Sequence, residues 1–332
     1  AWLYSHELGR MYLDETFPDK LETEYVAGVD ENNVEQVLED IIKSGADIVF
    51  CVGPQMMPNS LKVAVEHPEV YILNCSLNAP HPYIRTYYGR MYEAKFLAGM
   101  IAGAVTDNER VAYIADYPIY GMIANINAFA LGVASVNPRA KVYLAWSKTK
   151  DYDRNKFLEE NDLHYVSDQD IITPNDASRY FGLYKLQDGQ ALNLAMPIWN
   201  WGVFYEKLLQ SVLAGSYKVE GQEQVKALNY WWGMSAGVID LICSKHVPYG
   251  VKRLADHLKS DITKGEVVPF FGQIYNQKGE LKNKGEHEMK PSDIMKMDWL
   301  VDNVVGSIPP MSEFIDNAKM VVELKGVEGN KL

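Results

Sequence analysis

Short runs of apolar and β-branched residues alternate with amphipathic stretches along almost the whole chain of 332 residues. In the first half, residues 47–52 are typical of a buried strand, and residues 33–44 place Val34, Leu38 and Ile41 on one face of a helix. This alternation is the pattern of βαβ units, whose strands pair mainly in parallel. We therefore predict an α/β fold with mainly parallel sheets flanked by helices.

The pattern begins again near Asp107, and the chain is long enough for two compact domains. No linker rich in Pro, Gly or Ser separates the halves, so crossing chain segments should join the domains. Such a joint can act as a hinge that closes around a ligand. We predict one lobe from residues 1–107 with 233–266, a second lobe from residues 108–232 with 267–332, and hinge crossovers near residues 107, 232 and 267.

The charge of the chain argues against nucleic acid as a partner. The sequence has 32 Lys and Arg against 44 Asp and Glu, a net charge of -12, and no compensating basic block. The longest uncharged apolar run, residues 96–105, is far shorter than the roughly 20 residues that cross a bilayer, so no transmembrane segment is predicted. Cys51, Cys75 and Cys243 form no C-x-x-C pair, which predicts neither a disulfide framework nor a zinc site.

Sequence motifs for cofactors and catalysis are scarce. The sequence contains no P-loop, G-x-G-x-x-G, His-Glu-x-x-His or calcium-loop motif, so we predict no cofactor and no metal. Gly233-Met234-Ser235-Ala236-Gly237 matches the G-x-S-x-G elbow of serine hydrolases. A hydrolase also needs an acid and a histidine, and no local pattern marks either of them. We interpret the motif as a glycine-rich crossover turn and keep a serine hydrolase that uses Ser235 as an alternative.

Aromatic residues mark the ends of two predicted strands. Trp199 and Trp201 follow one strand, and Trp232 ends the run Tyr230-Trp231-Trp232 before the glycine turn. Open α/β sheets bind ligands beyond the carboxyl ends of their strands, and flat aromatic faces suit stacking on a planar heterocycle. Trp199 and Trp232 are therefore candidate ligand contacts, with core filling as the alternative interpretation.

Four polar residues are further candidates. His6 stands next to Glu7, which could indicate metal binding or acid–base chemistry, but a lone histidine is more often a hydrogen-bonding group. Arg90 lies near a strand end, where it can form an ion pair or bind a polar ligand edge. Asp116 follows an apolar strand and opens a loop that contains Tyr120. We predict ligand contacts for His6, Arg90, Asp116 and Tyr120.

Several short motifs follow one another along nearly the whole chain. They are Trp2-x-x-x-His6-x-x-Gly9-Arg10, Tyr88-Gly89-Arg90-Met91-Tyr92-Glu93, Phe96 to Gly103, Tyr113-Ile114-Ala115, Pro118-Ile119, Ile126 to Gly132, Val136-Asn137-Pro138, Trp199 to Gly202 with Tyr205, Phe271-Gly272-Gln273-Ile274, Gln277-x-Gly279, Met297-Asp298-Trp299-Leu300-Val301 and Gly306-x-Ile308-Pro309. In this order they resemble the basic membrane protein family, which comprises receptor lipoproteins of nucleoside ABC importers and related regulatory proteins.

The resemblance implies a two-lobed type I periplasmic-binding fold that holds a purine base or nucleoside between its lobes. It implies no reaction, an ABC permease as partner, and a bacterial protein outside the cytoplasm, either periplasmic or anchored as a lipoprotein. Trp2 and His6 match the family's early ligand-contacting segment, and Gly53 matches the loop after its second strand. Asp116 and Tyr120 match a loop that lines the cleft, and Trp199 falls where related receptors place a polar contact.

The chain departs from the family pattern in three places. The family's first strand and its Asp-Gly-Gly turn should precede Trp2, so we expect the protein to begin earlier than this sequence. The loop at Tyr120 has Tyr-Gly where many relatives have an acidic residue, and residues 148–184 fit the family loosely. A ligand-sensing domain of a larger, cytoplasmic regulatory protein is therefore the alternative function, and a lipoprotein signal upstream of Trp2 would favour the receptor.

Overall fold

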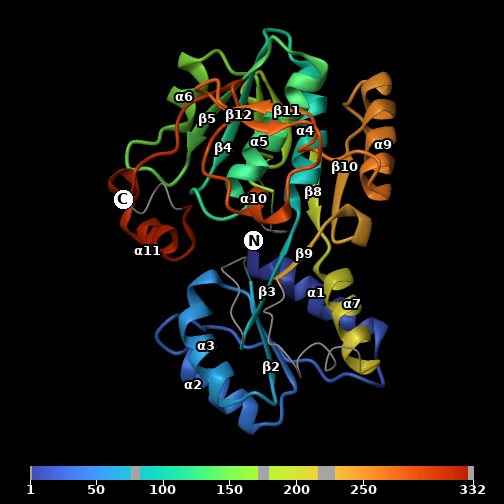
Figure 1. Ribbon diagram of the computed structural model, residues 1–332, viewed down its shortest axis with the longest axis vertical. Coiled ribbons are helices and arrows are strands. Elements are labelled where there is room, and N and C mark those ends of the chain that lie inside the picture. The colour runs from blue at the N-terminus through green and yellow to red at the C-terminus, as the bar shows by residue number, and fades with distance from the viewer. Residues whose placement is uncertain (1, 76–82, 171–178, 216–228, 328–332) are drawn as a thin grey trace. The chain divides into compact units, whose positions relative to one another are not determined.

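The computed structural model describes residues 2–75, 83–170, 179–215 and 229–327 (Figure 1). The chain divides into two compact units. Unit 1 comprises Ala1–Gly89 and Asn200–Trp232, and unit 2 comprises Arg90–Trp199 and Gly233–Leu332. The chain therefore passes from one unit to the other three times, after Gly89, Trp199 and Trp232.

Unit 1 contains a parallel sheet in the order β1-β2-β3-β9. Helices cover both faces of this sheet, α2 and α3 on one side and α1 and α7 on the other (Figure 1). A buried apolar cluster that includes Val34, Leu38, Val63 and Ile72 joins α2 and α3 to the strands. The elements are α1 (Trp2–Thr16), α2 (Val34–Lys43), β1 (Ile48–Cys51), α3 (Met57–Glu66), β2 (Tyr71–Asn74), β3 (Arg85–Gly89), α7 (Trp201–Leu213) and β9 (Asn229–Trp232).

Helices α1 and α7 approach each other closely because each has a glycine at their crossing. A Cβ atom on Gly9 would lie 2.9 Å from Trp201 Cβ, and a Cβ atom on Gly202 would lie 2.7 Å from the ring of Tyr12. Any larger side chain at these positions would push the helices apart. The close crossing places His6 of α1 against α7.

Unit 2 contains a seven-stranded sheet in the order β10-β8-β7-β6-β4-β5-β13. Strands β6, β4, β5 and β13 are parallel, whereas β7, β8 and β10 extend the sheet by antiparallel pairing. Its strands are β4 (Arg110–Ala115), β5 (Lys141–Trp146), β6 (Tyr165–Ser167), β7 (Leu183–Gln187), β8 (Gln190–Trp199), β10 (Ile239–Cys243) and β13 (Val304–Val305), and its helices are α4 (Met91–Val105), α5 (Met122–Val136), α6 (Arg154–Glu160), α9 (Tyr249–Lys264), α10 (Pro291–Met295) and α11 (Asp316–Lys325). The hairpin β11 (Gln273–Tyr275) and β12 (Leu281–Lys284) completes the unit.

The α/β class is confirmed, and the antiparallel part of unit 2 has a local cause. Asp188 and Gly189 join β7 to β8, and both have positive φ angles, 51° and 74°. Two consecutive residues with positive φ form the tight turn that matches the twist of a β-hairpin. The chain therefore reverses directly at Asp188 instead of crossing over through a helix.

The boundaries of the units differ from two of the three predicted crossovers. Residue 107 lies inside unit 2, because α4 packs directly on α5: a Cβ atom on Gly99 would overlap the carbonyl of Phe129, and one on Gly132 would overlap that of Phe96. Residue 267 also lies inside unit 2, and residues 200–232 belong to unit 1. The predicted crossover near residue 232 coincides with a boundary.

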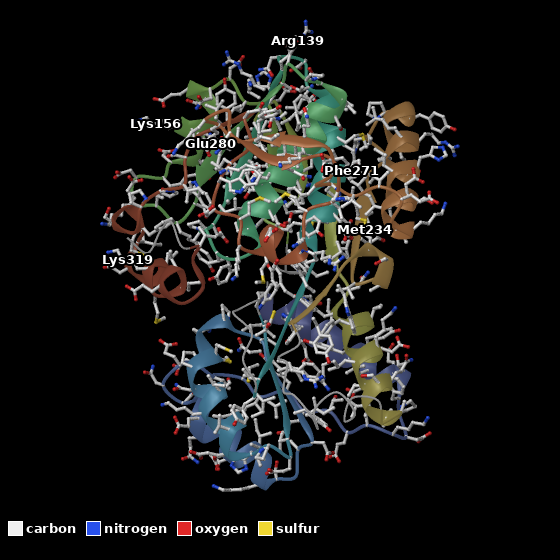
Figure 2. The ribbon with its side chains drawn as sticks, in the orientation of Figure 1. Arg139, Lys156, Met234, Phe271, Glu280 and Lys319 are labelled. Atoms are coloured by element: carbon white, nitrogen blue, oxygen red, sulfur yellow. The ribbon has the colours of Figure 1, made fainter. Side chains whose placement is uncertain are left out.

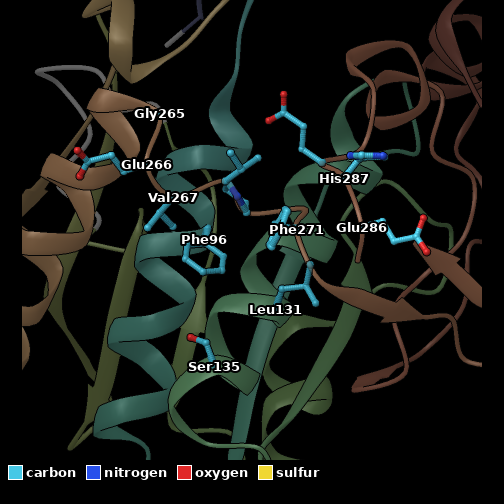
Figure 3. A pocket seen from close by; sticks show the side chains of 12 residues that line it. Phe96, Leu131, Ser135, Gly265, Glu266, Val267, Phe271, Glu286 and His287 are labelled. Atoms are coloured by element: carbon cyan, nitrogen blue, oxygen red, sulfur yellow. The ribbon is translucent and has the colours of Figure 1, made fainter. Parts of the chain in front are cut away.

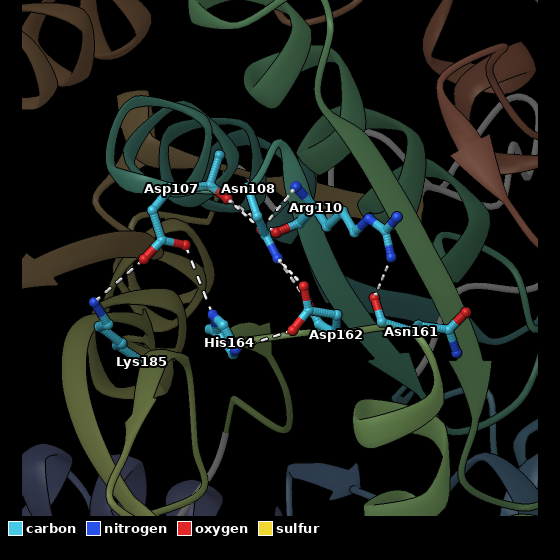
Figure 4. A network of polar contacts seen from close by, with 8 residues as sticks. Asp107, Asn108, Arg110, Asn161, Asp162, His164 and Lys185 are labelled. Atoms are coloured by element: carbon cyan, nitrogen blue, oxygen red, sulfur yellow. Dashed lines mark hydrogen bonds and ion pairs between the residues drawn. The ribbon is translucent and has the colours of Figure 1, made fainter.

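A polar network ties Asp107 into unit 2 at the amino ends of β4 and β6 (Figure 4). The Asp107 carboxylate lies 3.7 Å from Nδ1 of His164 and 3.8 Å from Nζ of Lys185. Asn108 Nδ2 donates to the carbonyl of Asp162 at 2.7 Å, and Arg110 donates to that of Asn161 at 2.9 Å. The restart of the sequence pattern near Asp107 thus marks the next strand of the same unit.

The described surface of unit 2 carries many outward charged side chains, including Arg139 and Lys156 (Figure 2). Arg139 pairs with Glu109 at 2.6 Å, and Lys156 lies 4.0 Å from Glu160 on the same helix. Within the described residues, no helix is both long enough and apolar enough to cross a membrane.

Candidate functional site

His6 lies in a buried aromatic cluster of unit 1. Its imidazole stacks on Trp201 with ring centroids 4.3 Å apart, and Trp2 meets it edge-on at 4.7 Å. Its Nδ1 atom lies 2.6 Å from the hydroxyl oxygen of Tyr205. The side chain is 4% exposed, and this burial lowers the pKa of His6 to about 3. The ring is therefore neutral at physiological pH.

Trp2 and Gly53 meet at the carboxyl end of β1. The indole Nε1 of Trp2 donates to the carbonyl of Val52 at 2.7 Å, immediately before Gly53. Asn74, the last residue of β2, donates through Nδ2 to the carbonyl of Gly53 at 3.0 Å. The structure therefore brings Trp2, His6 and Gly53 together beside the edge where the parallel strands of unit 1 end.

Trp232 ends β9 and so lies at the same edge of the unit 1 sheet. Its ring is half-buried and packs against Phe204 and Tyr230 with centroid distances of 5.1 and 5.4 Å. Phe204 is fully buried. One side of the Trp232 ring therefore fills the core, which was the alternative to a ligand contact. The rest of the ring surface is exposed.

The carboxyl ends of the strands in unit 2 carry a second polar set. Asp116 follows β4, and its carboxylate accepts a hydrogen bond from Ser147, which follows β5. Asp168 follows β6 and accepts a hydrogen bond from the Tyr184 hydroxyl at 3.0 Å. Arg154 completes the set with its Nε atom 3.6 Å from the Asp168 carboxylate. Of these residues Asp116 was predicted from the sequence, and Ser147, Arg154 and Asp168 were not.

Arg90, Tyr120 and Trp199 lie at the same edge of unit 2. Arg90 immediately precedes the first residue of α4. The last residue of α4 leads to the amino end of β4, so the first residue of α4, and Arg90 with it, lies at the carboxyl edge of the sheet. Tyr120 is in the loop between β4 and α5. Because β8 is antiparallel to β7, and β7 to β6, β8 runs in the direction of β6 and its last residue Trp199 reaches this edge. The edge set of unit 2 is Arg90, Asp116, Tyr120, Ser147, Arg154, Asp168 and Trp199.

A buried ion pair lies behind this edge. Lys95 on α4 is 1% exposed, and its Nζ lies 2.6 Å from the Asp170 carboxylate and 3.1 Å from the Ser167 hydroxyl. Desolvation raises the pKa of Asp170, and the neighbouring ammonium of Lys95 opposes that shift. Lys95 is followed by ten uncharged residues of the same helix, and a lone lysine in such a stretch was the sequence signal for this pair.

The Gly233 to Gly237 motif forms a turn around Glu93. The backbone N–H of Met234 donates to the buried Glu93 carboxylate at 2.6 Å, and a Cβ atom on Gly233 would overlap that carboxylate. Gly237 has a φ of 74°, which favours glycine. Ser235 is exposed, and among the described residues it has no hydrogen bond to a histidine or an acid. The glycine-turn interpretation is confirmed over the nucleophile elbow.

A pocket of 820 Å³ lies elsewhere on unit 2, beside α4 and α5 (Figure 3). Phe96 and Leu131 from these helices line it together with Val267, Phe271 and Glu286. None of the residues predicted to contact ligand lines this pocket. The residues predicted to contact ligand therefore lie at the two strand edges and outside this pocket.

Two α/β units joined by three chain crossings form the two-lobed fold that is typical of substrate-binding proteins. Residues 1–179 match the family model described as ABC transporter substrate-binding protein PnrA-like, and the chain belongs to this family. The predicted family is thereby confirmed. The chain is a binding protein and not an enzyme.

Two relatives of known name align with most of the chain. The purine-binding protein BAB2_0673 of Brucella abortus (strain 2308) is 27% identical over 323 residues, which are 93% of this chain and 90% of the relative. The putative ABC transporter glucose-binding protein TsgA13 of Haloferax volcanii is 30% identical over 251 residues, 72% of this chain and 62% of the relative.

Two solved structures share the fold. An ABC transporter solute-binding protein from Conexibacter woesei DSM 14684 has a TM-score of 0.56 at 17% identity, over 81% of this chain and 93% of that chain. A transcriptional activator of the comK gene from Bacillus halodurans has a TM-score of 0.62 at 13% identity, over 81% of this chain and 96% of that chain. At these identities the likeness describes the fold alone, and the two-lobed fold predicted from the sequence is confirmed.

Proposed function

We propose that this substrate-binding protein binds a purine base or nucleoside and presents it to an ABC importer. The observation that carries the proposal is the aromatic edge of unit 1, where Trp2, His6 and Gly53 lie together at the end of a parallel sheet. The match to a purine-binding relative over 93% of the chain supports it.

The chemistry of the two edges suits a purine. A planar base gains about 1 to 3 kcal/mol from stacking on one aromatic side chain, and unit 1 offers the rings of Trp2 and Trp232 at its edge. Unit 2 offers charged groups, Arg90 and Asp116, which can bind the polar rim of a base or the hydroxyls of a ribose. We propose Trp2, His6, Gly53 and Trp232 of unit 1 and Arg90, Asp116, Tyr120 and Trp199 of unit 2 as ligand contacts.

A hexose is the competing ligand class, because TsgA13 is named as a putative glucose-binding protein. Sugars also stack on aromatic rings and bind carboxylates, so the residue types alone favour neither class strongly. The aligned share supports the purine, because the purine-binding relative aligns with 93% of this chain and TsgA13 with 72%.

A thermal-shift screen tests the proposal. The purified chain is heated with adenine, guanine, their nucleosides, uridine and glucose, each in parallel. A ligand at 100 times its dissociation constant adds about 2.7 kcal/mol to the unfolding free energy, so a binding purine should raise Tm by several degrees. A shift with glucose and none with any purine would contradict the proposal.

A second experiment distinguishes a receptor for transport from a ligand-sensing domain of a regulatory protein. Substrate-binding proteins of ABC transporters are extracytoplasmic, and we propose that a lipid anchor holds this one at the membrane. Deleting the gene should then abolish high-affinity purine uptake and leave the transcription of purine genes unchanged. Unchanged uptake with altered transcription would favour the ligand-sensing domain of a regulatory protein.

A further inference from the structure

Three hydrogen-bonding side chains form a chain through the aromatic cluster of unit 1. The hydroxyl oxygen of Tyr87 on β3 lies 3.4 Å from that of Tyr205 on α7. The Tyr205 hydroxyl oxygen lies 2.6 Å from Nδ1 of His6 on α1. None of the three residues is more than 4% exposed. We refer to them as the Tyr87–Tyr205–His6 chain.

One arrangement of protons satisfies both hydroxyl groups. The neutral imidazole of His6 carries a single proton, on Nδ1 or on Nε2. If Nδ1 carried it, His6 would donate to Tyr205 and Tyr205 to Tyr87, and the Tyr87 proton would find no acceptor among the described residues. If Tyr87 donates to Tyr205 and Tyr205 to Nδ1, both hydroxyl protons are bonded and the imidazole proton lies on Nε2.

The Nε2 atom of His6 is then a buried donor that still needs an acceptor. It has no hydrogen-bond partner among the described residues. The two indoles beside it cannot serve, because Trp2 and Trp201 carry only an N–H donor. A buried donor without an acceptor is unfavourable, so this atom sets a requirement that a bound molecule can meet.

We propose that Tyr205 is a positioning residue that fixes His6 as the Nε2–H tautomer, and that this N–H donates to an acceptor atom of the bound purine. The inference rests on the proposed function and deepens it, because it names what the ligand must offer. A ring nitrogen with a free lone pair or a carbonyl oxygen fits, whereas an N–H or a methylated nitrogen at that place does not.

The tautomer is measured on the free protein. In long-range ¹H–¹⁵N spectra of imidazole-labelled protein, His6 should show a protonated Nε2 and an Nδ1 shifted by its hydrogen bond. Tyr205→Phe should move the Nδ1 signal and average the two ring nitrogens. Tyr12→Phe is the matched control, because its hydroxyl lies on α1 but bonds to Glu206. A protonated Nδ1 in the wild type, or an unchanged spectrum in Tyr205→Phe, overturns the role of Tyr205.

The acceptor is identified by calorimetry with adenosine or guanosine, whichever the screen shows to bind. The analogues are the 1-deaza, 3-deaza and 7-deaza forms of adenosine, or the 3-deaza, 7-deaza and 6-deoxo forms of guanosine. One analogue should bind the wild type at least tenfold more weakly than its parent nucleoside does. In His6→Phe the same analogue and its parent should bind with equal affinity. His6→Gln, which keeps an amide donor near Nε2, should restore part of that discrimination, and His6→Asn should not. Equal affinity ratios in the wild type and His6→Phe would overturn the inference and leave purine binding intact. Failure of every purine to bind would overturn the proposed function and this ligand step with it, while the tautomer result stands on the free protein.

Discussion

The backbone N–H of Met234 donates to the carboxylate of Glu93 at 2.6 Å, and this bond holds the chain where it re-enters unit 2 after β9. Glu93 is on the first turn of α4, three residues after the chain enters unit 2 for the first time at Arg90. One buried carboxylate therefore fixes two of the three points at which the chain changes unit. Gly233, the residue before Met234, has no side chain and so leaves room for the Glu93 carboxylate.

Replacing Gly233 with alanine should destabilise the protein. The added Cβ atom would overlap the Glu93 carboxylate, which is buried and hydrogen-bonded and cannot move freely. Overpacking of this kind costs about 1 to 3 kcal/mol. Gly250→Ala is the control, because nothing lies within 4 Å of a Cβ atom at that position of α9. Urea unfolding measures both, and an equal midpoint for the two variants would refute the crowding at Gly233.

Glu93→Gln should change how stability depends on pH. Desolvation raises the pKa of Glu93 above its usual 4.5, although the Met234 bond and Arg90 lower it in part. A raised pKa in the folded state means that folding favours the protonated acid, so the wild type loses stability as pH rises from about 4.5 through the folded pKa. The glutamine variant lacks this loss. As pH rises through that range, the unfolding free energy of Glu93→Gln should therefore increase relative to that of the wild type. A difference between the two proteins that stays constant with pH would show that the pKa of Glu93 is not raised.

The strand and helix pattern of the sequence predicted the α/β class because apolar periodicity reports local structure directly. The β1 strand and the α2 helix lie within the predicted residues. The predicted boundary at residue 107 was misplaced because the packing of Gly99 on Phe129 joins helices that no local pattern connects. The Asp188-Gly189 turn, in contrast, has a sequence that is typical of a tight β-hairpin, so the reversal from β7 to β8 was predictable.

The candidate site was predictable where a residue directly follows a strand. That rule found Asp116, and applied to the strands at 141–146 and 165–167 it would also have found Ser147 and Asp168. The contact of His6 with Tyr205 could not be predicted, because 199 residues separate them and only the crossing of α1 on α7 brings them together. Hydrogen-bonding partners of this kind depend on packing between helices and leave no periodic trace in the sequence.

Lys95→Met should weaken the protein by removing one partner of a buried ion pair. Its loss leaves the Asp170 carboxylate and the Ser167 hydroxyl without their common donor. Removing one member of a buried pair costs about 3 to 5 kcal/mol, and the partial exposure of Asp170 places the expected value at or below the lower end of that range. Combining Lys95→Met with Asp170→Asn should cost less than the sum of the single changes. Additive costs would show that the two side chains do not interact.

His67 should make a pH-dependent contribution to the stability of unit 1. Hydrogen bonds to Glu69 and Glu39 raise the pKa of His67 above 6.5. A raised pKa in the folded state stabilises the protein while the histidine is protonated, so the contribution is complete below pH 6.5 and disappears as pH rises through the folded pKa. His67→Gln should therefore lower Tm at pH 6 and leave it nearly unchanged at pH 9, with the histidine titration followed by NMR. The same loss of Tm at both pH values would mean that the ion pairs are not the cause.

Trp199→Ala should weaken ligand binding more than tenfold, while Ser235→Ala leaves it unchanged. Trp199 ends β8 at the carboxyl edge of unit 2, where we propose that the ligand binds, and removing its ring removes about 1 to 3 kcal/mol of stacking on a base. Ser235 is exposed on the Glu93 turn and has no place in the proposed site, so it serves as the control. Calorimetric titration with the nucleoside found in the screen gives both dissociation constants, and neither variant should consume the ligand. An unchanged dissociation constant for Trp199→Ala would remove Trp199 from the site, because a ring that stacks on the base cannot be deleted without cost.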